Sequence, residues 1–283
     1  MQVEAFERHR AMLLGIACRM LGSSSDAEDA VQDAWLRWQA ADNTNVRDER
    51  AFLATTVSRL CIDRLTSARA RRESYVGPWL PEPVRTSSEI DPETLCLAFL
   101  VALERLTPVE RAALIPHRVF EYSHHEIASL LNLTEHASRQ ALFRAAQHLA
   151  VETPRFRADP SHHRRLASAF LAAVRSGDLS RITELLTKDA TLRADGGGKI
   201  SGAATRPVVG AVAVARFLLG LAARFPASAI GAEEQVINGE WALVLSFNQV
   251  VISVMAFETD GQRISGIRNV VNPEKLGLRT LSL

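Results

Sequence analysis

The sequence predicts a multidomain protein, with two all-α domains followed by an α+β domain. Its 283 residues suffice for two to three domains of ordinary size. Apolar residues recur at three-to-four spacing up to about residue 150, and a proline-rich segment interrupts this helical pattern near residue 80. Strand-like runs separated by hairpin turns follow in the last third of the chain.

Composition predicts a soluble globular protein of the cytoplasm. Hydrophobic residues make up 47% and charged residues 23% of the chain, and no apolar run approaches the roughly 20 residues of a membrane span. The N-terminus has neither the basic start nor the apolar stretch of a signal peptide. Cys18, Cys61 and Cys96 are widely spaced, which predicts small core residues and neither a disulfide framework nor a zinc ribbon.

The first domain, residues 1–76, is predicted to be helical throughout. Ser25 and Glu28 have the spacing of a capping box that would begin a second helix, and a third helix is predicted from Arg47 to Arg72. Three prolines in the stretch Pro78–Pro83 forbid a helix, so residues 77–90 are predicted to be a linker.

A second helical domain is predicted for residues 91–152, with a further linker at 153–161. Capping boxes at Thr107–Glu110 and Ser123–Glu126 mark two helix starts. A break at Asn132–Thr134 then gives a helix-turn-helix with an inner apolar face of Ile127, Leu130, Leu133, Ala137, Leu142 and Leu149. Its outward residues would be His136, Arg139, Gln140 and Arg144, which suits major-groove binding but also fits a helical hairpin with a solvated face.

The third domain, residues 162–283, changes to an α+β pattern. Helices are predicted at about 162–176 and 208–222, with a glycine-rich turn at 195–198. Strands are predicted at Trp241–Phe247 and Val250–Phe257. The pairs Asn238-Gly239 and Asp260-Gly261 are strong hairpin signals.

Two opposite charge clusters lie in the first domain, although the net charge of the whole chain is only +1. Four acids without a base occupy one predicted helix, and they suit a protein partner: Asp26, Glu28, Asp29 and Asp33. Four arginines without an acid end the next helix, beside Tyr75: Arg64, Arg69, Arg71 and Arg72. Basic residues with a nearby aromatic suit single-stranded DNA, although a solvated charge run has the same composition.

Three segments resemble sigma factors of the extracytoplasmic-function type. The run Asp26–Trp38 is similar to the region 2 helix that docks on the RNA polymerase beta-prime subunit, and Phe52–Leu65 to the helix that handles the −10 element. Residues 103–149 resemble the region 4 helix-turn-helix that recognises the −35 element. The resemblance implies a promoter-recognition subunit that works with the beta and beta-prime subunits of core polymerase and with promoter DNA.

Three further strings resemble the group of these sigma factors that carries a fused SnoaL-like domain. They are Trp79-Leu-Pro-Glu-Pro83, Asp195-Gly-Gly-Gly-Lys199 and Asn272-Pro-Glu-Lys-Leu276. With them the resemblance covers nearly the whole chain, and it implies an α+β cone as the third domain. It also implies that this domain tunes the two sigma domains in place of a separate anti-sigma factor.

Site residues follow from the resemblance one by one. Those implied to face the polymerase are Asp26, Asp29, Asp33 and Trp35. Those implied to contact DNA are Asn43 and Asn45 in a base-capturing loop, Arg64, Arg69, Arg71 and Arg72 on the backbone, and His136, Arg139, Gln140 and Arg144 at the −35 element. Those implied to join the linker to the third domain are Trp79, Pro81, Pro83, Asp195, Gly196, Gly197, Gly198, Lys199, Asn272 and Pro273. The family's usual second arginine is missing at Arg144-Ala145-Ala146.

Two other kinds of function also fit parts of this pattern. A stand-alone regulator would bind DNA through the helix-turn-helix and sense a ligand in the cone, without polymerase. An isomerase or cyclase would need an acid-base pair, but no His, Tyr or Cys follows His163, and Asp195 and Asp260 precede glycine as ordinary turn residues do. His117, His124, His125 and Cys96 lack a recognised metal-ligand spacing, so no metal and no cofactor are predicted.

Overall fold

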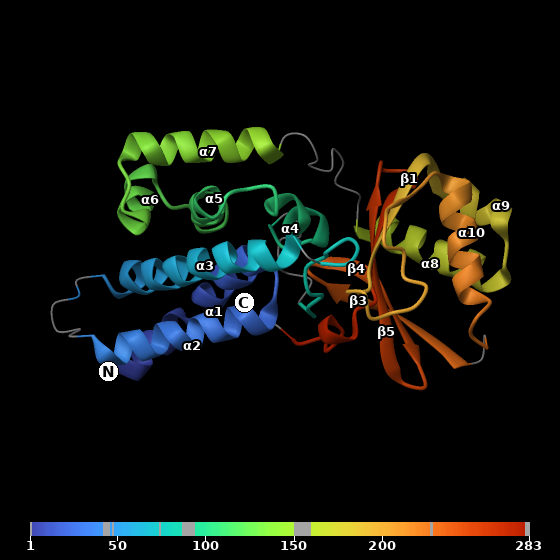
Figure 1. The fold of residues 1–283 in the computed structure, drawn as a ribbon, viewed down its shortest axis with the longest axis horizontal. Coiled ribbons are helices and arrows are strands. Elements are labelled where there is room, and N and C mark those ends of the chain that lie inside the picture. Colours follow the sequence, from blue (N-terminus) through green and yellow to red (C-terminus); the bar gives the residue numbers. More distant parts are fainter. Residues whose placement is uncertain are drawn as a thin grey trace. The chain divides into compact units, whose positions relative to one another are not determined.

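The computed structural model describes residues 2–41, 46, 48–73, 75–86, 94–149, 160–226 and 229–280, without the side chains of residues 68–73 and 160. Its contacts divide the chain into two compact units (Figure 1). The first contains residues 1–73 and 99–153, and the second contains residues 74–98 and 154–281. None of the described helices is long and apolar enough to cross a membrane.

The described part of the first unit contains helices and no strands. Its helices are α1 (Gln2–Leu21), α2 (Ser24–Ala40), α3 (Glu49–Glu73), α5 (Pro108–Phe120), α6 (His124–Leu131) and α7 (Glu135–Leu149). Helices α1, α2 and α3 pack on one another around Leu13, Ile16 and Trp38, whereas α5, α6 and α7 form a second group (Figure 1). Helix α4 (Leu97–Leu103) crosses from one unit to the other along the chain.

Local capping signals set several helix starts. Thr107 and Ser123 each form a reciprocal capping box with the glutamate three residues on, as predicted. The capping box predicted at Ser25 is wrong, because Ser23 is the N-cap of α2 and its hydroxyl accepts from the Asp26 amide at 3.2 Å. Asn132 ends α6 in the left-handed conformation, which confirms the predicted break before α7.

The second unit is an α+β layer structure. Its elements are α8 (Pro160–Ser176), α9 (Leu179–Leu185), β1 (Leu186–Asp195), β2 (Val208–Val209), α10 (Ala211–Ala222), β3 (Ile230–Ile237), β4 (Glu240–Phe247), β5 (Val250–Thr259), β6 (Ile264–Val270) and the short 3-10 helix η4 (Pro273–Lys275). The six strands form one sheet in the order β2-β1-β6-β5-β4-β3, parallel only between β1 and β6.

Helices α8, α9 and α10 lie along one face of this sheet (Figure 1). Phe170 of α8 packs against Phe257 of β5, and Val214 of α10 belongs to the same buried cluster. His163 joins this interface, because its Nε2 lies 3.0 Å from the Phe257 carbonyl oxygen. The hydrophobic core of the unit therefore consists of residues from its own helices and strands.

The hairpins of the sheet confirm most of the sequence pattern. Asn238-Gly239 joins β3 to β4 with both residues at positive φ, and Asp260 accepts from the amides of Gln262 and Arg263 in the β5–β6 turn. The predicted second helix begins at Ala211 and not at 208, because Val208 and Val209 pair with β1. Strands β1, β2, β3 and β6 and helix α9 were not among the predicted elements.

Candidate functional sites

Asp195, at the end of β1, is the centre of a buried polar cluster. Its side chain is fully buried, and Oδ1 accepts from the Tyr75 hydroxyl at 2.6 Å and from the Gly197 amide at 3.2 Å. Oδ2 accepts from the Leu80 amide at 2.8 Å and from Lys275 Nζ at 2.7 Å. The carboxylate thus has a turn contact, as its place before glycine suggested, and a contact with the predicted linker stretch at Leu80. Its contacts with Tyr75 and Lys275 were not predicted from the sequence.

The linker side of this cluster is the segment 75–80, which lies in the same compact unit as Asp195. Tyr75 was predicted to lie near DNA, but its hydroxyl donates to Asp195 and accepts from Asn272 Nδ2 at 2.9 Å. Burial and then the neighbouring Asp195 carboxylate raise the pKa of Tyr75, so the phenol remains a donor at neutral pH.

The glycines of the 196–198 turn approach the linker closely. A Cβ on Gly197 would lie 3.0 Å from the Tyr75 hydroxyl, and one on Gly198 would lie 3.1 Å from Cβ of Val76. Both glycines have positive φ, which favours glycine in its own right. The turn was predicted to contact the linker at Trp79–Pro83. Asp195 accepts from the Leu80 amide there, and the glycines lie next to Tyr75 and Val76, just before that stretch.

The η4 segment closes the cluster from the other side. Lys275 donates to the Leu80 carbonyl oxygen at 2.6 Å, and its ammonium lies 4.3 Å from the ring centroid of Trp79. Asn272 caps η4 and Lys199 pairs with Glu274. Lys275 and Tyr75 were not predicted as site residues. Lys275 lies within the string Asn272–Leu276 that carries the family resemblance, and Tyr75 lies next to the arginine cluster that ends at Arg72.

Further along the linker, residues 84–86 extend the sheet. The Val84 amide donates to Asn238 Oδ1 at 3.1 Å, and the Asn238 amide donates back to the Val84 carbonyl oxygen at 2.9 Å. Arg85 bridges to Ile237 of β3 and to Thr280. Pro81 and Pro83 are buried, and Trp79 is half-buried. The linker therefore lies along the edge strand β3 as an added extended segment.

In the first unit, the two opposite charge clusters meet at Arg64. Its Nη2 donates to Asp33 Oδ2 at 2.6 Å and its Nη1 to the Asp26 carbonyl oxygen at 3.2 Å. Asp26 and Asp29 are exposed, and Trp35 packs on Phe6 at a centroid distance of 5.0 Å. Asn43, Asn45 and the side chains of Arg69, Arg71 and Arg72 lie outside the described residues.

On α7, the four side chains predicted to point outward are all exposed: His136, Arg139, Gln140 and Arg144. Arg139 pairs with Glu135 at 2.7 Å, and Arg144 Nε lies 3.2 Å from Glu110 Oε1. Phe143 is 63% exposed on the same helix and was missed. Its position next to Arg144 is the signal that could have identified it.

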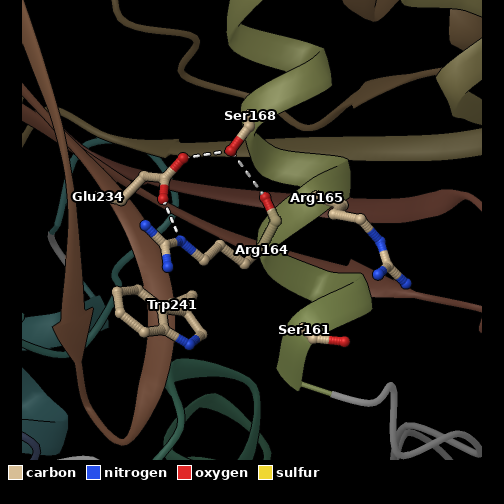
Figure 2. Close-up of a pocket in the computed structure, with 6 residues that line it drawn as sticks. All are labelled: Ser161, Arg164, Arg165, Ser168, Glu234 and Trp241. Atoms are coloured by element: carbon tan, nitrogen blue, oxygen red, sulfur yellow. Dashed lines mark hydrogen bonds and ion pairs between the residues drawn. The ribbon is translucent and has the colours of Figure 1, made fainter.

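A polar hollow on α8 is lined by side chains that pair with one another (Figure 2). Arg164 donates to Glu234 Oε2 at 2.5 Å and lies over the ring of Trp241 at 4.8 Å, and Ser168 also donates to Glu234. Arg165 extends to the other side of the helix in this view. The cluster fixes α8 to β3 and β4. Across the described ranges, no group of His, Cys, Asp and Glu side chains could hold a metal ion.

Comparisons with known proteins agree with this arrangement. The family models for sigma-70 region 2 and sigma-70 region 4 match residues 5–71 and 96–149. The chain is 36% identical to the ECF RNA polymerase sigma factor SigJ of Mycobacterium tuberculosis, over 97% of this chain and 93% of that protein. It is 31% identical to the probable sigma factor SigI of the same species, over 96% and 93%.

A crystal structure of Mycobacterium tuberculosis SigJ matches with a TM-score of 0.78 and 33% identity, covering 99% of this chain and 100% of that one. The match includes the α+β part, so the predicted fold class is confirmed. The family is not enzymatic, which decides against the isomerase or cyclase. The chain belongs to the extracytoplasmic-function sigma factors of RNA polymerase, with regions 2 and 4 for promoter recognition.

Proposed function

We propose that the C-terminal part of this sigma factor restrains transcription initiation by holding the linker between regions 2 and 4. The observation that carries the proposal is the buried Asp195 carboxylate, which accepts from the Tyr75 hydroxyl and the Leu80 amide at the same time. Residues 75–86 connect regions 2 and 4 in sequence, so a linker held on the sheet limits how far the two regions can separate.

Hydrogen bonds to a buried charge support this role, because they are stronger than neutral ones and are costly to leave unmade. The restraint lies in the same chain, so the sigma factor would work without a separate anti-sigma factor. We further propose the predicted domain limits, 1–76, 77–90, 91–152, 153–161 and 162–283, and activity in the cytoplasm together with core polymerase.

Roles for the other predicted residues form part of the proposal. Asp26, Asp29 and Trp35 would contact the beta-prime subunit. Asn43 and Asn45 would bind a base extracted from the −10 element, and Arg69, Arg71 and Arg72 would hold the DNA backbone. The exposed face of α7 would enter the major groove at the −35 element. Asp33 pairs with Arg64, which supports a role of this pair in fixing α2 to α3.

The test is transcription in vitro with core polymerase, using full-length chains that carry Asp195→Asn or Tyr75→Phe. We expect both substitutions to release the linker and to raise transcript yield severalfold. Asp260→Asn is the matched control, because Asp260 also precedes a glycine in a turn, and within the described ranges its side chain accepts only from amides of its own hairpin. Equal yields from all four proteins would contradict the proposal.

A further inference from the structure

The α+β unit encloses a cavity whose function is not explained by linker docking. Its volume is about 730 Å³, within the range of small-molecule sites. It lies between α8, α10 and the sheet, and its wall is mainly apolar: Phe170, Val174, Leu218, Leu243, Leu245 and Met255. A space of this size with an apolar wall suits the hydrophobic body of an organic ligand.

Two polar side chains interrupt the apolar wall at neighbouring strands. Ser253 of β5 and Asn269 of β6 are 4% and 2% exposed, and both line the cavity. The Ser253 hydroxyl lies 2.6 Å from Asn269 Oδ1, which occupies the acceptor of the amide. Asn269 Nδ2 donates to no residue in the described part of the chain. Asn269 lines the cavity, so an acceptor atom inside the cavity would satisfy this amide.

Basic side chains line the exposed part of the cavity. Arg175 in the last turn of α8 and Arg224 just after α10 are both exposed and both line it. Arg224 lies against the 196–203 loop, because its Nη1 is the atom nearest to the place that a Cβ on Gly202 would take. No acidic side chain among the described residues lines the cavity. The mouth therefore favours an anionic group and disfavours a cationic one.

We propose that this cavity binds an amphipathic organic acid that acts as an effector of the sigma factor. The apolar body of the ligand lies among α8, α10 and the sheet, and an inner acceptor oxygen receives a hydrogen bond from Asn269. The carboxylate lies at the mouth beside Arg175 and Arg224. This inference rests on the proposed function, since it assigns a signal to the linker contact.

A physical connection between cavity and linker runs through one loop. Ile200, Gly202 and Ala203 line the cavity. The backbone of Gly197 and Gly198 in the same loop lies close to Tyr75 and Val76. Ala194 and Val271 also line the cavity and directly adjoin Asp195 and Asn272. A ligand that displaces this loop changes the contacts that hold the linker.

Binding is tested by calorimetry on the full-length chain with ω-hydroxydecanoate, which has both an acid and a distant hydroxyl oxygen. Decanoate lacks the distant oxygen, and decanol lacks the charge. We expect ω-hydroxydecanoate to bind at one site per chain. Decanoate should bind about tenfold more weakly and decanol more weakly still, because losing one hydrogen bond to a polar or charged group changes affinity by about this much.

Three variants assign the contacts. Replacing both Arg175 and Arg224 with glutamine should abolish the preference for decanoate over decanol. Arg216→Gln should not, because Arg216 lies on α10 but does not line the cavity. Asn269→Leu should abolish the preference for ω-hydroxydecanoate over decanoate. Ile252→Trp should fill the cavity and prevent binding of all three. No binding by the unaltered chain, or unchanged preferences in the double arginine variant, would overturn the site.

Coupling to the linker is measured separately, by amide hydrogen exchange of residues 75–86 with and without saturating ω-hydroxydecanoate. We expect faster exchange at the Leu80 amide, which donates to Asp195. Unchanged exchange would reject the effector role while leaving the binding site intact. Neither measurement uses polymerase, so a failure of the proposed function in transcription remains distinguishable from a failure of this inference.

Discussion

At the scale of single residues, two buried carboxyl groups of the second unit, those of Asp195 and Glu240, differ in how their charge is compensated. Asp195 is buried but is surrounded by four donors, so its charge is compensated. Glu240, which begins β4, has a different balance. Burial raises the pKa of Glu240 to about 7, and the positive charge of Arg268 only partly opposes this. Its titration therefore falls in the neutral range and affects stability there.

We expect Glu240 to make this protein less stable as pH rises from about 4.5 to about 7. In that window the native carboxyl holds a proton that the unfolded chain has already lost, so the contribution to the free energy of unfolding declines. Part of the residue is exposed, and solvent screening limits the change to about 1–2 kcal/mol. Glu240→Gln should remove this dependence.

Urea denaturation of the unaltered chain and of Glu240→Gln at pH 5.5 and pH 8 measures this change in the free energy of unfolding. Both pH values lie about one unit or more from the pKa of Glu240. Burial lowers the pKa of His163, which acts in the opposite direction, but this contribution cancels when the variant is compared with the unaltered chain. A difference between the two proteins that does not vary with pH would show that Glu240 titrates normally.

At the scale of elements, the sequence correctly predicted features that depend on contacts between residues close in the chain, such as helix caps and hairpin turns. The capping boxes at Thr107 and Ser123 and the Asn238-Gly239 hairpin involve residues within a few positions, and the structure has them where the sequence placed them. Strand β1 was missed because Lys188 and Asp189 interrupt its apolar alternation and α9 directly precedes it. The docking of the linker depends on partners more than a hundred residues away, which periodicity does not reveal.

Helix α7 presents a prediction at this scale. Phe143 shares an exposed face with Arg139 and Arg144, where an aromatic ring suits contact with a thymine methyl group in the major groove. We expect Phe143→Ala to lose about 1 kcal/mol of discrimination at one thymine of the −35 element. Arg139→Ala, in contrast, should weaken binding similarly on all sequences if it contacts phosphate.

Competition between promoter variants for the holoenzyme measures this discrimination. Val109→Ala is the matched control, because Val109 is an exposed apolar residue in the first turn of α5 of the same unit. If Phe143→Ala and Val109→Ala discriminate between promoters equally well, the ring does not contact a base.

At the scale of the whole molecule, regions 2 and 4 lie in the same compact unit, and a buried arginine forms hydrogen bonds between them. Arg111 of α5 is 2% exposed and donates to the Met20 carbonyl oxygen of α1 at 2.6 Å and to the Leu103 carbonyl oxygen at 2.5 Å. It also pairs with Glu104 at 2.9 Å. Burial lowers the pKa of Arg111 to about 9, so the group remains charged at neutral pH.

We expect Arg111→Met to lower the free energy of unfolding by about 3 kcal/mol, because two buried carbonyl oxygens and Glu104 lose their partner. Chemical denaturation of the full-length chain measures the loss. Arg37→Met, at an exposed arginine of α2, should change stability by less than about 0.5 kcal/mol. Similar effects of the two substitutions would mean that Arg111 does not join the regions energetically.

The linker that lies on β3 also determines the length of a tether. Fully extended, residues 75–86 alone would span about 40 Å, a distance comparable to about a dozen base pairs of B-DNA. While this segment is bound to Asp195 and Asn238, it cannot extend to connect regions 2 and 4 over a longer distance. We therefore expect release of this segment to widen the range of spacer lengths between −35 and −10 elements that the holoenzyme accepts.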